Sequence, residues 1–366
     1  MNITHLVSSK NKSYGILKIT VRRRNGSIKY VREQQVDSLT RTLWIMLRAW
    51  MSGLSSVQAP RYSDGANDNI STTNSHQTTK GGAGTNMGII LGTGSGAVLV
   101  TNHQLSSLIP HGVATGEMNR SANEVSLGNS GYTITRVFEN SSGSTVNISE
   151  AGVTMVNIRE TDPALNRVML FCRDLVDPAV PVEDGESATV VYDLFFNTGN
   201  RNLGSPWRQM IKEPITSFTD FNVTFWRANG TTADIHWATS LNTTASAGQA
   251  RNIFVGSGDT APAIDDLDLE TLIPHGVESG QLLYGTGETS ALQITNNNER
   301  LEFDTTRVIT NESGDDITIR EIALFSNTSI SNMGTRTMLD RYVLPTPITL
   351  AHGESRVARW LFRYAI

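Results

Sequence analysis

Short stretches in which apolar and polar residues alternate recur along the whole chain. Tyr132–Phe138 alternates with a period of two, and Tyr14–Val21 and Ser27–Arg32 are similar stretches on either side of Asn25-Gly26. Successive side chains of a strand point to opposite faces, and Asn-Gly favours a tight hairpin turn because both residues tolerate positive φ. The pattern therefore predicts half-buried β-strands joined by turns.

The same reasoning predicts strands in both halves of the chain. Gly88–Gly92 is apolar throughout and closed by glycines, which predicts a fully buried strand. The other expected strands are Thr145–Ser149 leading into Glu150–Val153, Val168–Cys172, Ala188–Phe196, Phe221–Trp226, Phe254-Val255, Glu302–Asp304, Asp316–Ile319, Thr337–Leu339 and Val357–Ala365. Many short strands separated by turn residues are typical of β-sandwiches.

Two segments have helical signals. Leucines and Trp50 recur at helical spacing after a cap at Asp37 or Ser38, and Gly53 can end this helix. Ser205-Pro206 is a cap and first-turn pair that predicts a short helix through Lys212. We expect the first helix to pack against a sheet of its own unit.

The hexapeptide Leu-Ile-Pro-His-Gly-Val occurs twice, at Leu108–Val113 and at Leu272–Val277. At the same spacing, Gly92-Thr93-Gly94 corresponds to Gly256-Ser257-Gly258. A repeat of this length indicates a duplicated structural unit. The predicted fold is therefore mainly β, with two tandem β-sandwich-like units and short helices. We expect residues 1–196 (an N-terminal hairpin, a helix and a sandwich) to form the first unit and residues 197–366 the second.

The composition agrees with this fold. Only 18% of the 366 residues are charged, and Ser, Thr, Asn and Gly take their place, which suits strands and turns. Two polar segments, residues 55–85 and 229–249, predict long surface loops. The net charge of −5 argues against general nucleic-acid binding, because such proteins usually carry a basic face.

Neither secretion nor membrane insertion is expected. The N-terminus has no basic start followed by an apolar stretch, so we expect no signal peptide and synthesis in the host cytoplasm. The apolar run Leu43–Leu47 is far shorter than the roughly 20 residues of a membrane span. Cys172 is the only cysteine, so no intrachain disulfide can form, and its apolar neighbours predict a buried thiol.

Candidate metal and catalytic residues are few. His111 and His275 lie in Pro-His-Gly, where turn chemistry is favoured over catalysis or metal binding. The acidic run 265–270 (Asp-Asp-Leu-Asp-Leu-Glu) is the strongest calcium candidate, but its spacing fits no EF-hand, and a solvated acidic loop or a helix N-terminus is favoured. Whether it binds calcium stays open. We assign no catalytic, cofactor-binding or metal residue.

Two further motifs have a structural and a functional interpretation. Gly92–Gly96 resembles a phosphate-binding loop only loosely, and strand-ending glycines are the preferred explanation. Arg22–Arg24, with Lys18, Lys29 and Arg32, makes the N-terminal hairpin basic. That charge either binds an acidic partner or nucleic acid, or prevents pairing at a sheet edge.

Three charged positions recur in both halves. They are Arg136 with Arg307, Glu150 with Glu321, and Arg173 with Arg341. Because their signs are opposite, we expect a structural ion pair inside each unit. Taking Arg307 and Glu321 as partners, exchange of the two residues should restore the stability lost by either single reversal.

Five short motifs together resemble tailed-bacteriophage structural proteins, such as β-sandwich components of tails, necks or capsid decorations. They are Gly92-Thr93-Gly94, Glu150–Val153, Glu321–Leu324, Met338–Arg341 and Pro347–Leu350. The similarity covers most of each half. It implies a virion protein that has no catalytic residues to carry over.

The expected function is that of a virion structural protein of the tail or neck. It would bind other virion proteins and form a homo-oligomer, acting through many weak subunit contacts. Alternatives are a capsid decoration protein or an adhesion module that binds host glycans through Trp226 and Trp237. An enzyme such as a polysaccharide depolymerase is not expected, because no acid–base pair stands out. The position in the virion, the symmetry and the host stay open.

Overall fold

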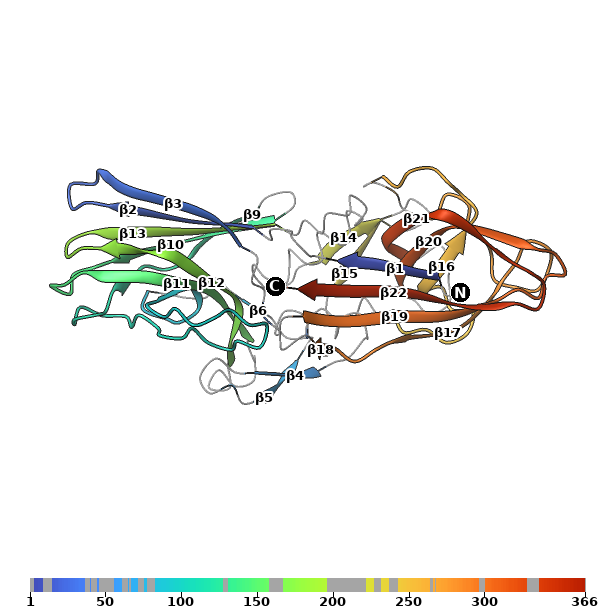
Figure 1. Cartoon of the computed structure of the whole chain (residues 1–366), viewed down its shortest axis with the longest axis horizontal. Helices are drawn as coiled ribbons and strands as arrows, with labels where there is room; N and C mark the ends of the chain where they lie inside the picture. Colours follow the sequence, from blue (N-terminus) through green and yellow to red (C-terminus); the bar gives the residue numbers. More distant parts are fainter. Residues whose placement is uncertain are drawn as a thin grey trace.

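Figure 1 shows the protein as a computed structural model, in which two β-rich lobes contain most of the strands. The structure describes residues 3–8, 15–36, 40, 45, 56–60, 65, 67–71, 76–77, 83–127, 131–157, 167–195, 222–226, 232–236, 243–263, 266, 268–295, 300–327 and 336–365. The fold is mainly β, as the sequence predicted.

The first lobe contains two sheets. One has the strand order β3-β2-β13-β10-β8, with β9 also paired to β10, and the other has the order β12-β11-β6, with β7 also paired to β11. The strands are β2 Gly15–Arg22, β3 Ile28–Val36, β6 His76–Gln77, β7 Gly88–Gly92, β8 Asn119–Arg120, β9 Glu124–Leu127, β10 Gly131–Glu139, β11 Val146–Asn157, β12 Arg167–Val182 and β13 Ser187–Phe195. Gly26 takes a φ of 81° between β2 and β3, which confirms the Asn-Gly hairpin.

The second lobe repeats this arrangement. One sheet has the order β1-β22-β19-β17, with β18 also paired to β19, and the other has the order β16-β20-β21. The strands are β1 Ile3–Ser8, β16 Asn252–Gly256, β17 Leu283–Thr289, β18 Gln293–Thr295, β19 Arg300–Thr310, β20 Ile317–Asn327, β21 Arg336–Leu350 and β22 Ser355–Ala365.

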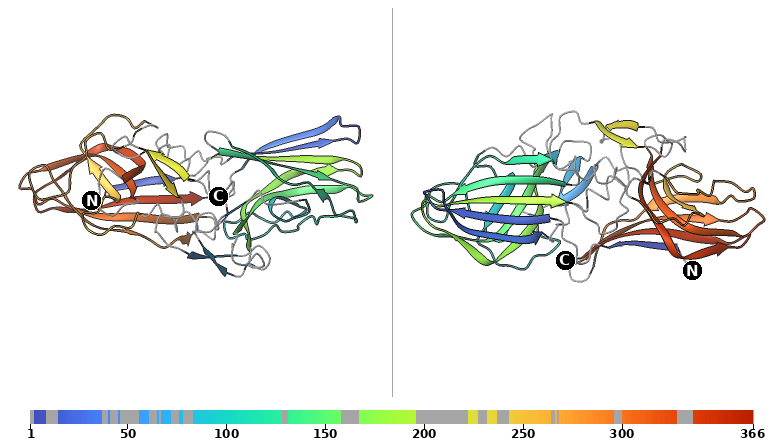
Figure 2. Two further views of the ribbon diagram at one scale, coloured as in Figure 1. Left: turned by 180° about the vertical axis from the view of Figure 1, so that it is seen from behind. Right: turned by 90° about the horizontal axis from the view of Figure 1, so that it is seen from above.

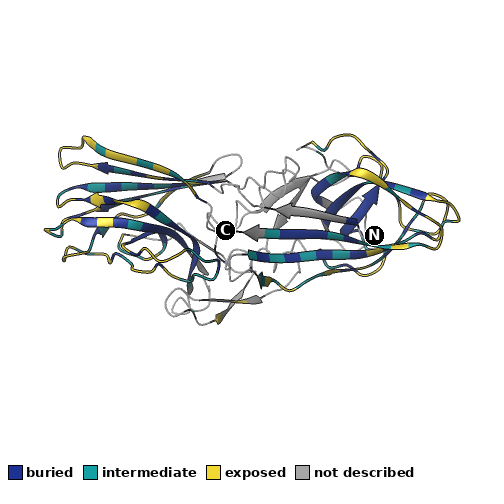
Figure 3. Ribbon diagram, in the orientation of Figure 1, coloured by how far each residue is buried: buried dark blue, intermediate teal, exposed yellow. Residues whose placement is uncertain are grey.

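In each lobe the two sheets face each other across an apolar core. β2 and β19 alternate between buried and more exposed residues, whereas β7 and β16 are buried throughout, as expected for Gly88–Gly92 (Figure 3). Contacts cross between the sheets: Tyr192 of β13 donates to Asp174 of β12 at 3.1 Å, and the rings of Phe254 and Tyr284 lie 4.6 Å apart. The apolar alternation seen in the sequence therefore marks the inner faces of the sheets.

The two lobes share details that general β-propensity does not predict. The pairing of β11 with β12 shifts register between Ile148 and Glu150 and again between Val153 and Thr154. The pairing of β20 with β21 shifts at the corresponding residues, the first shift falling between Ile319 and Glu321. Bulges at matching positions support a tandem duplication of one unit.

The N-terminal strand lies in the second lobe. β1 pairs in parallel with β22, next to the C-terminus, whereas β2 pairs antiparallel with β13 of the first lobe (Figures 1 and 2). The other pairings among the described strands are antiparallel. We expected residues 1–196 to form the first unit; Ile3–Ser8 of that range instead completes a sheet of the second.

Both segments expected to be long loops contain strands, so those predictions were wrong in part. β4 (Ser56–Pro60) pairs with β5 (Asn67–Ser71), and β14 (Asn222–Trp226) pairs with β15 (Thr232–His236). Short polar strands can satisfy their backbone groups by pairing with each other, and this needs no apolar run.

The expected short helices are not confirmed. The described residues contain no complete helix. Of the helix expected after Ser38, only Thr40 and Ile45 are described; both are buried, and the backbone of Ile45 is helical. The helix expected from Ser205 through Lys212 lies outside the described residues.

Candidate functional site

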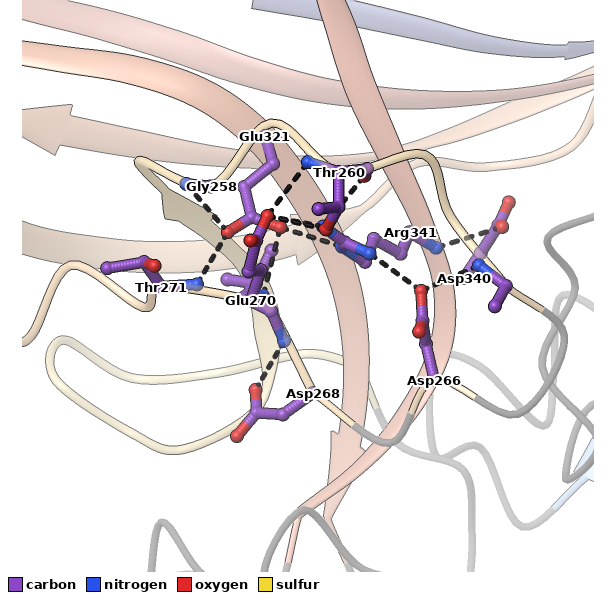
Figure 4. Close-up of polar contacts among 11 residues, drawn as sticks. Gly258, Thr260, Asp266, Asp268, Glu270, Thr271, Glu321, Asp340 and Arg341 are labelled. Carbon is purple, nitrogen blue, oxygen red and sulfur yellow. Dashed lines mark hydrogen bonds and ion pairs between the residues drawn. The ribbon is translucent and has the colours of Figure 1, made fainter.

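Two of the three recurring charged positions, a glutamate and an arginine, form an ion pair around a buried carboxylate in each lobe, which we call the carboxylate cluster. In the second lobe, Glu321 lies at the bulge of β20 and is completely buried. It accepts hydrogen bonds from the backbone N–H groups of Gly258 at 3.1 Å, Glu270 at 3.2 Å and Thr271 at 2.9 Å (Figure 4). One side chain of a strand thus holds both ends of the loop that follows β16.

Arg341 of β21 completes this cluster. Its Nε donates to Glu321 at 2.7 Å and its Nη1 to Asp266 at 2.7 Å, while Glu270 lies 3.6 Å from Nη2 (Figure 4). Burial lowers the pKa of Arg341, but hydrogen bonds to Asp266 and Glu321 outweigh burial and hold this pKa above its ordinary value. Arg341 is therefore a fixed cation held among carboxylates.

The first lobe repeats the arrangement with fewer charges. Glu150 accepts from the N–H groups of Gly94, Ser106 and Ser107 at 3.1, 3.0 and 2.7 Å, and from Nε of Arg173 at 2.8 Å. The other contacts of Arg173 are with the carbonyls of Gly96 and Ala97, Asn102 and the Ser106 hydroxyl. The first cluster thus has uncharged groups where the second has Asp266 and Glu270.

Glycine at the strand end allows the carboxylate to approach. A Cβ on Gly256 would lie 2.4 Å from Oε1 of Glu321 and 2.6 Å from the Thr271 carbonyl, and Gly92 is equally crowded by Glu150. The strand-end explanation of Gly92–Gly96 is thereby supported. In each cluster, four donors occupy the four lone-pair positions of the carboxylate. The chemistry that this arrangement supports is the fixing of a loop onto a sheet.

Arg136 and Arg307 do not pair with these carboxylates, so the expected partnership of Arg307 with Glu321 is wrong. Arg307 donates instead to backbone carbonyls of Gln249, Arg251, Ile253 and Gly285. Burial lowers its pKa to about 10. The guanidinium carbon also lies 4.7 Å from the centre of the Phe254 ring, so aromatic and carbonyl groups surround this cation.

Arg136 has the same role in the first lobe. It donates to the carbonyls of Met87, Ile89 and Ser121. Burial, and secondarily the nearby charge of Arg120, lower its pKa to about 10. The second lobe has Tyr284 at the place of Arg120, and both side chains donate to the carbonyl of the corresponding isoleucine, Ile273 or Ile109.

Both histidines have the structural role that the turn motif predicted. Nδ1 of His111 accepts from the N–H of Arg120 at 3.1 Å, and Nδ1 of His275 accepts from the N–H of Tyr284 at 3.1 Å. A Cβ on Gly248 would lie 2.8 Å from the His275 ring. The imidazoles thus hold the turn that brings each hexapeptide back to its sheet.

The acidic run 265–270 mainly supplies partners for a cation of the protein itself. Asp266 and Glu270 contact Arg341, and Asp268 accepts from the N–H of Leu269 at 2.8 Å. Asp265 lies outside the described residues. Within the described ranges, no group of three or more His, Cys, Asp or Glu side chains is placed to hold a metal ion.

The remaining sequence candidates are distributed over the molecule. Cys172 is completely buried, as predicted, and burial followed by the charge of Asp174 raises the pKa of its thiol. Trp226 lies in β14, but its side chain and all of Trp237 lie outside what the structure describes. No helix in the described part of the chain is both long and apolar enough to span a membrane.

Sequence reasoning gave no role to a pair of buried asparagines. The side-chain amide of Asn140 donates to the carbonyls of Ser144 and Val182, each at 2.7 Å. Asn311 binds Asp315 and Leu350 in the same way, at 2.7 and 2.8 Å. Their recurrence at matching places, each three residues before a turn glycine, is the signal that could have identified them.

Comparison of the chain with protein-family models, with characterised proteins and with solved structures gave no match.

Proposed function

We propose that this chain is a bacteriophage virion structural protein, as part of a tail or neck, that acts through multivalent contacts between subunits. The duplication carries the proposal: the charged residues that recur in both lobes bind loops and strands of their own lobe. Residues kept in both copies therefore serve the shape of the unit, which is what an assembly component needs.

The surface adds support. Within the described strands, β3 pairs with β2 alone and carries exposed Ile28, Tyr30 and Val31. Strand edges with apolar side chains are common sites of pairing with another chain. A protein with two similar units can make several weak contacts at once, and these add up to stable attachment in a particle.

Particle composition tests the proposal. Virions released from cells that carry the gene would be purified on a density gradient and analysed by quantitative mass spectrometry. We expect the chain at a fixed ratio to the major capsid protein in every infectious fraction, and immunogold electron microscopy should place it at the tail or neck. Its absence from infectious particles, with abundant protein in the lysate, would refute the virion role. Gold over the whole capsid would favour a decoration protein.

A further inference from the structure

Strand β3, at the edge of the first lobe, carries exposed apolar side chains of the kind found in protein interfaces. β3 is the end strand of its sheet among the described strands, as Figure 1 shows, and Figure 3 shows exposed residues along it. Ile28, Tyr30 and Val31 are 53%, 38% and 47% exposed. An edge strand offers a row of backbone N–H and C=O groups to a further strand.

Contacts on the inner side hold β3 in place. Gln34 donates to the carbonyl of Leu175 in the facing sheet at 2.6 Å, and Arg32 donates to the carbonyl of Asp177. Lys29, the bulged residue of the strand, contacts Glu183 at 2.8 Å and Glu186 at 2.9 Å. A strand fixed in this way loses little conformational freedom when another strand binds to it.

Symmetry restricts how β3 can pair with β3 of a second copy. Two identical antiparallel strands related by a two-fold axis place either one residue opposite itself or two consecutive residues opposite each other. In an antiparallel pair, directly opposed residues also point their backbone groups in the same sense, either both toward or both away from the partner. Only registers centred on a residue satisfy both conditions, and those near the middle of β3 centre on Val31, Arg32 or Glu33.

Charge selects among these three registers. Centring on Arg32 opposes two arginines, and centring on Glu33 opposes two glutamates, both of which are unfavourable. Centring on Val31 places the two valines together and Tyr30 against Arg32, a cation against an aromatic ring. Glu33 then lies opposite the bulge at Lys29, whose ammonium is already held by Glu183 and Glu186, so this register opposes no like charges. Registers centred on Tyr30 or Gln34 overlap over fewer residues.

We propose that β3 is a homodimer interface, in which two copies join edge to edge in antiparallel fashion about a two-fold axis at Val31. The six-stranded sheet then continues from one protomer into the other. This proposal deepens the assembly function and rests on it for its role in the particle. One strand edge buries little area, so we expect a reversible dimer that is favoured at the high local concentration of an assembly.

Cysteine cross-linking in the full chain tests the register. Val31→Cys, Glu33→Cys and Gln35→Cys each place one thiol on the outer side of β3, and the wild type is the control because its Cys172 is buried. Opposed residues of an antiparallel pair lie within the reach of a disulfide. Under mild oxidation we expect a disulfide-linked dimer from Val31→Cys in large excess over the other two variants. Equal cross-linking in all three, none in any, or an excess from Glu33→Cys would overturn the proposal.

Sedimentation measures the same contact without a new thiol. Val31→Lys brings two lysines together at the two-fold axis, so we expect dimer affinity to fall about tenfold. Val308→Lys, the same change at an exposed site in the second lobe, should leave dimerisation unchanged. Equal affinity of the two variants would count against the interface. If the chain is present in virions but does not dimerise through β3, only this interface is wrong. If the chain dimerises through β3 but is absent from virions, only the proposed function is wrong.

Discussion

The residues shared by the two lobes act mainly by filling hydrogen-bonding positions in the interior. A buried carboxylate is costly unless donors surround it, and each cluster supplies three backbone N–H groups and one guanidinium. The clusters differ in what would remain if the carboxylate were neutralised. Arg341 would keep Asp266 and Glu270, whereas the other contacts of Arg173 are uncharged.

This difference predicts unequal effects of one substitution. Glu150→Gln leaves Arg173 buried without a carboxylate, so we expect the free energy of unfolding to fall by about 3–5 kcal/mol. Glu321→Gln should cost less, because Asp266 and Glu270 still neutralise Arg341. Urea unfolding measures both. Glu302→Gln, which removes a partly exposed partner of Arg363, is the control and should cost less than about 1 kcal/mol. A larger loss for Glu321→Gln than for Glu150→Gln would contradict this explanation.

Asp340 gives the protein a pH dependence of known sign. Burial raises the pKa of its carboxyl well above the ordinary value, and the N–H of Arg341 only partly offsets this. A carboxyl with a raised folded-state pKa binds more protons in the folded state, so its contribution is most favourable at low pH and is lost as pH rises through that pKa.

Asparagine imitates the protonated form of this carboxyl. We therefore expect Asp340→Asn to be more stable than the wild type at neutral pH, with an advantage that shrinks as the solution is acidified. Chemical unfolding across the acidic and neutral range measures the difference. Asp316→Asn, at an exposed position of the same lobe, shows the effect of losing a surface carboxylate. An advantage for Asp340→Asn that grew on acidification would show that the sign is wrong.

Strands β7 and β16 each contact a carboxylate cluster at a glycine, Gly92 and Gly256. In Gly256→Ala, the new Cβ overlaps both the Glu321 carboxylate and the fixed Thr271 carbonyl, so β16 must move away from the loop. We expect a loss of about 1–3 kcal/mol. Hydrogen exchange should also become faster in β16 and in the loop up to Thr271. Gly285→Ala is the control, because its nearest neighbour would lie at 3.3 Å. Equal losses in the two variants would mean that close approach to Glu321 is not what requires glycine.

At the scale of elements, the sequence predicts strands well where their inner faces are apolar. β10 coincides with a stretch that alternates in the sequence, and the Asn-Gly turn between β2 and β3 forms as expected, but of β19 only Glu302–Asp304 was predicted. β4, β5 and β15 were missed because they carry few apolar residues and are defined by pairing with a neighbour. Hydrophobic periodicity reports burial, so it does not detect strands held by backbone pairing alone.

The candidate site was predicted in part. Recurrence in the two halves identified the glutamates and arginines, but it could not identify which arginine contacts which glutamate. That choice depends on the sheet in which each residue lies: Glu150 follows a bulge of β11 and faces β12, whereas Arg136 lies on β10 in the other sheet and donates to the carbonyl of Ile89 in β7. A bulge changes the register without a strong sequence signal.

The path of the whole chain links the two lobes through β1. Since β1 comes first in sequence and pairs with β22 near the end, the chain begins in the second lobe, builds the strands of the first lobe and then returns to the second (Figure 2). Ile3 of β1 is buried, and β22 also contributes the buried Trp360 and Phe362 to the core. Removal of β1 therefore exposes the edge of β22 in the second lobe and leaves the sheets of the first lobe unchanged.

Removal of residues 1–8 tests this topology. We expect amide hydrogen exchange to become faster along β22 and β19, whereas β13 and β2 keep their protection, because β13 of the first lobe pairs with β2 instead. A synthetic peptide with the sequence of residues 1–8, added in trans, should restore protection of β22, and a scrambled peptide should not. Unchanged exchange in β22, or equal loss of protection in both lobes, would show that β1 does not complete the second lobe alone.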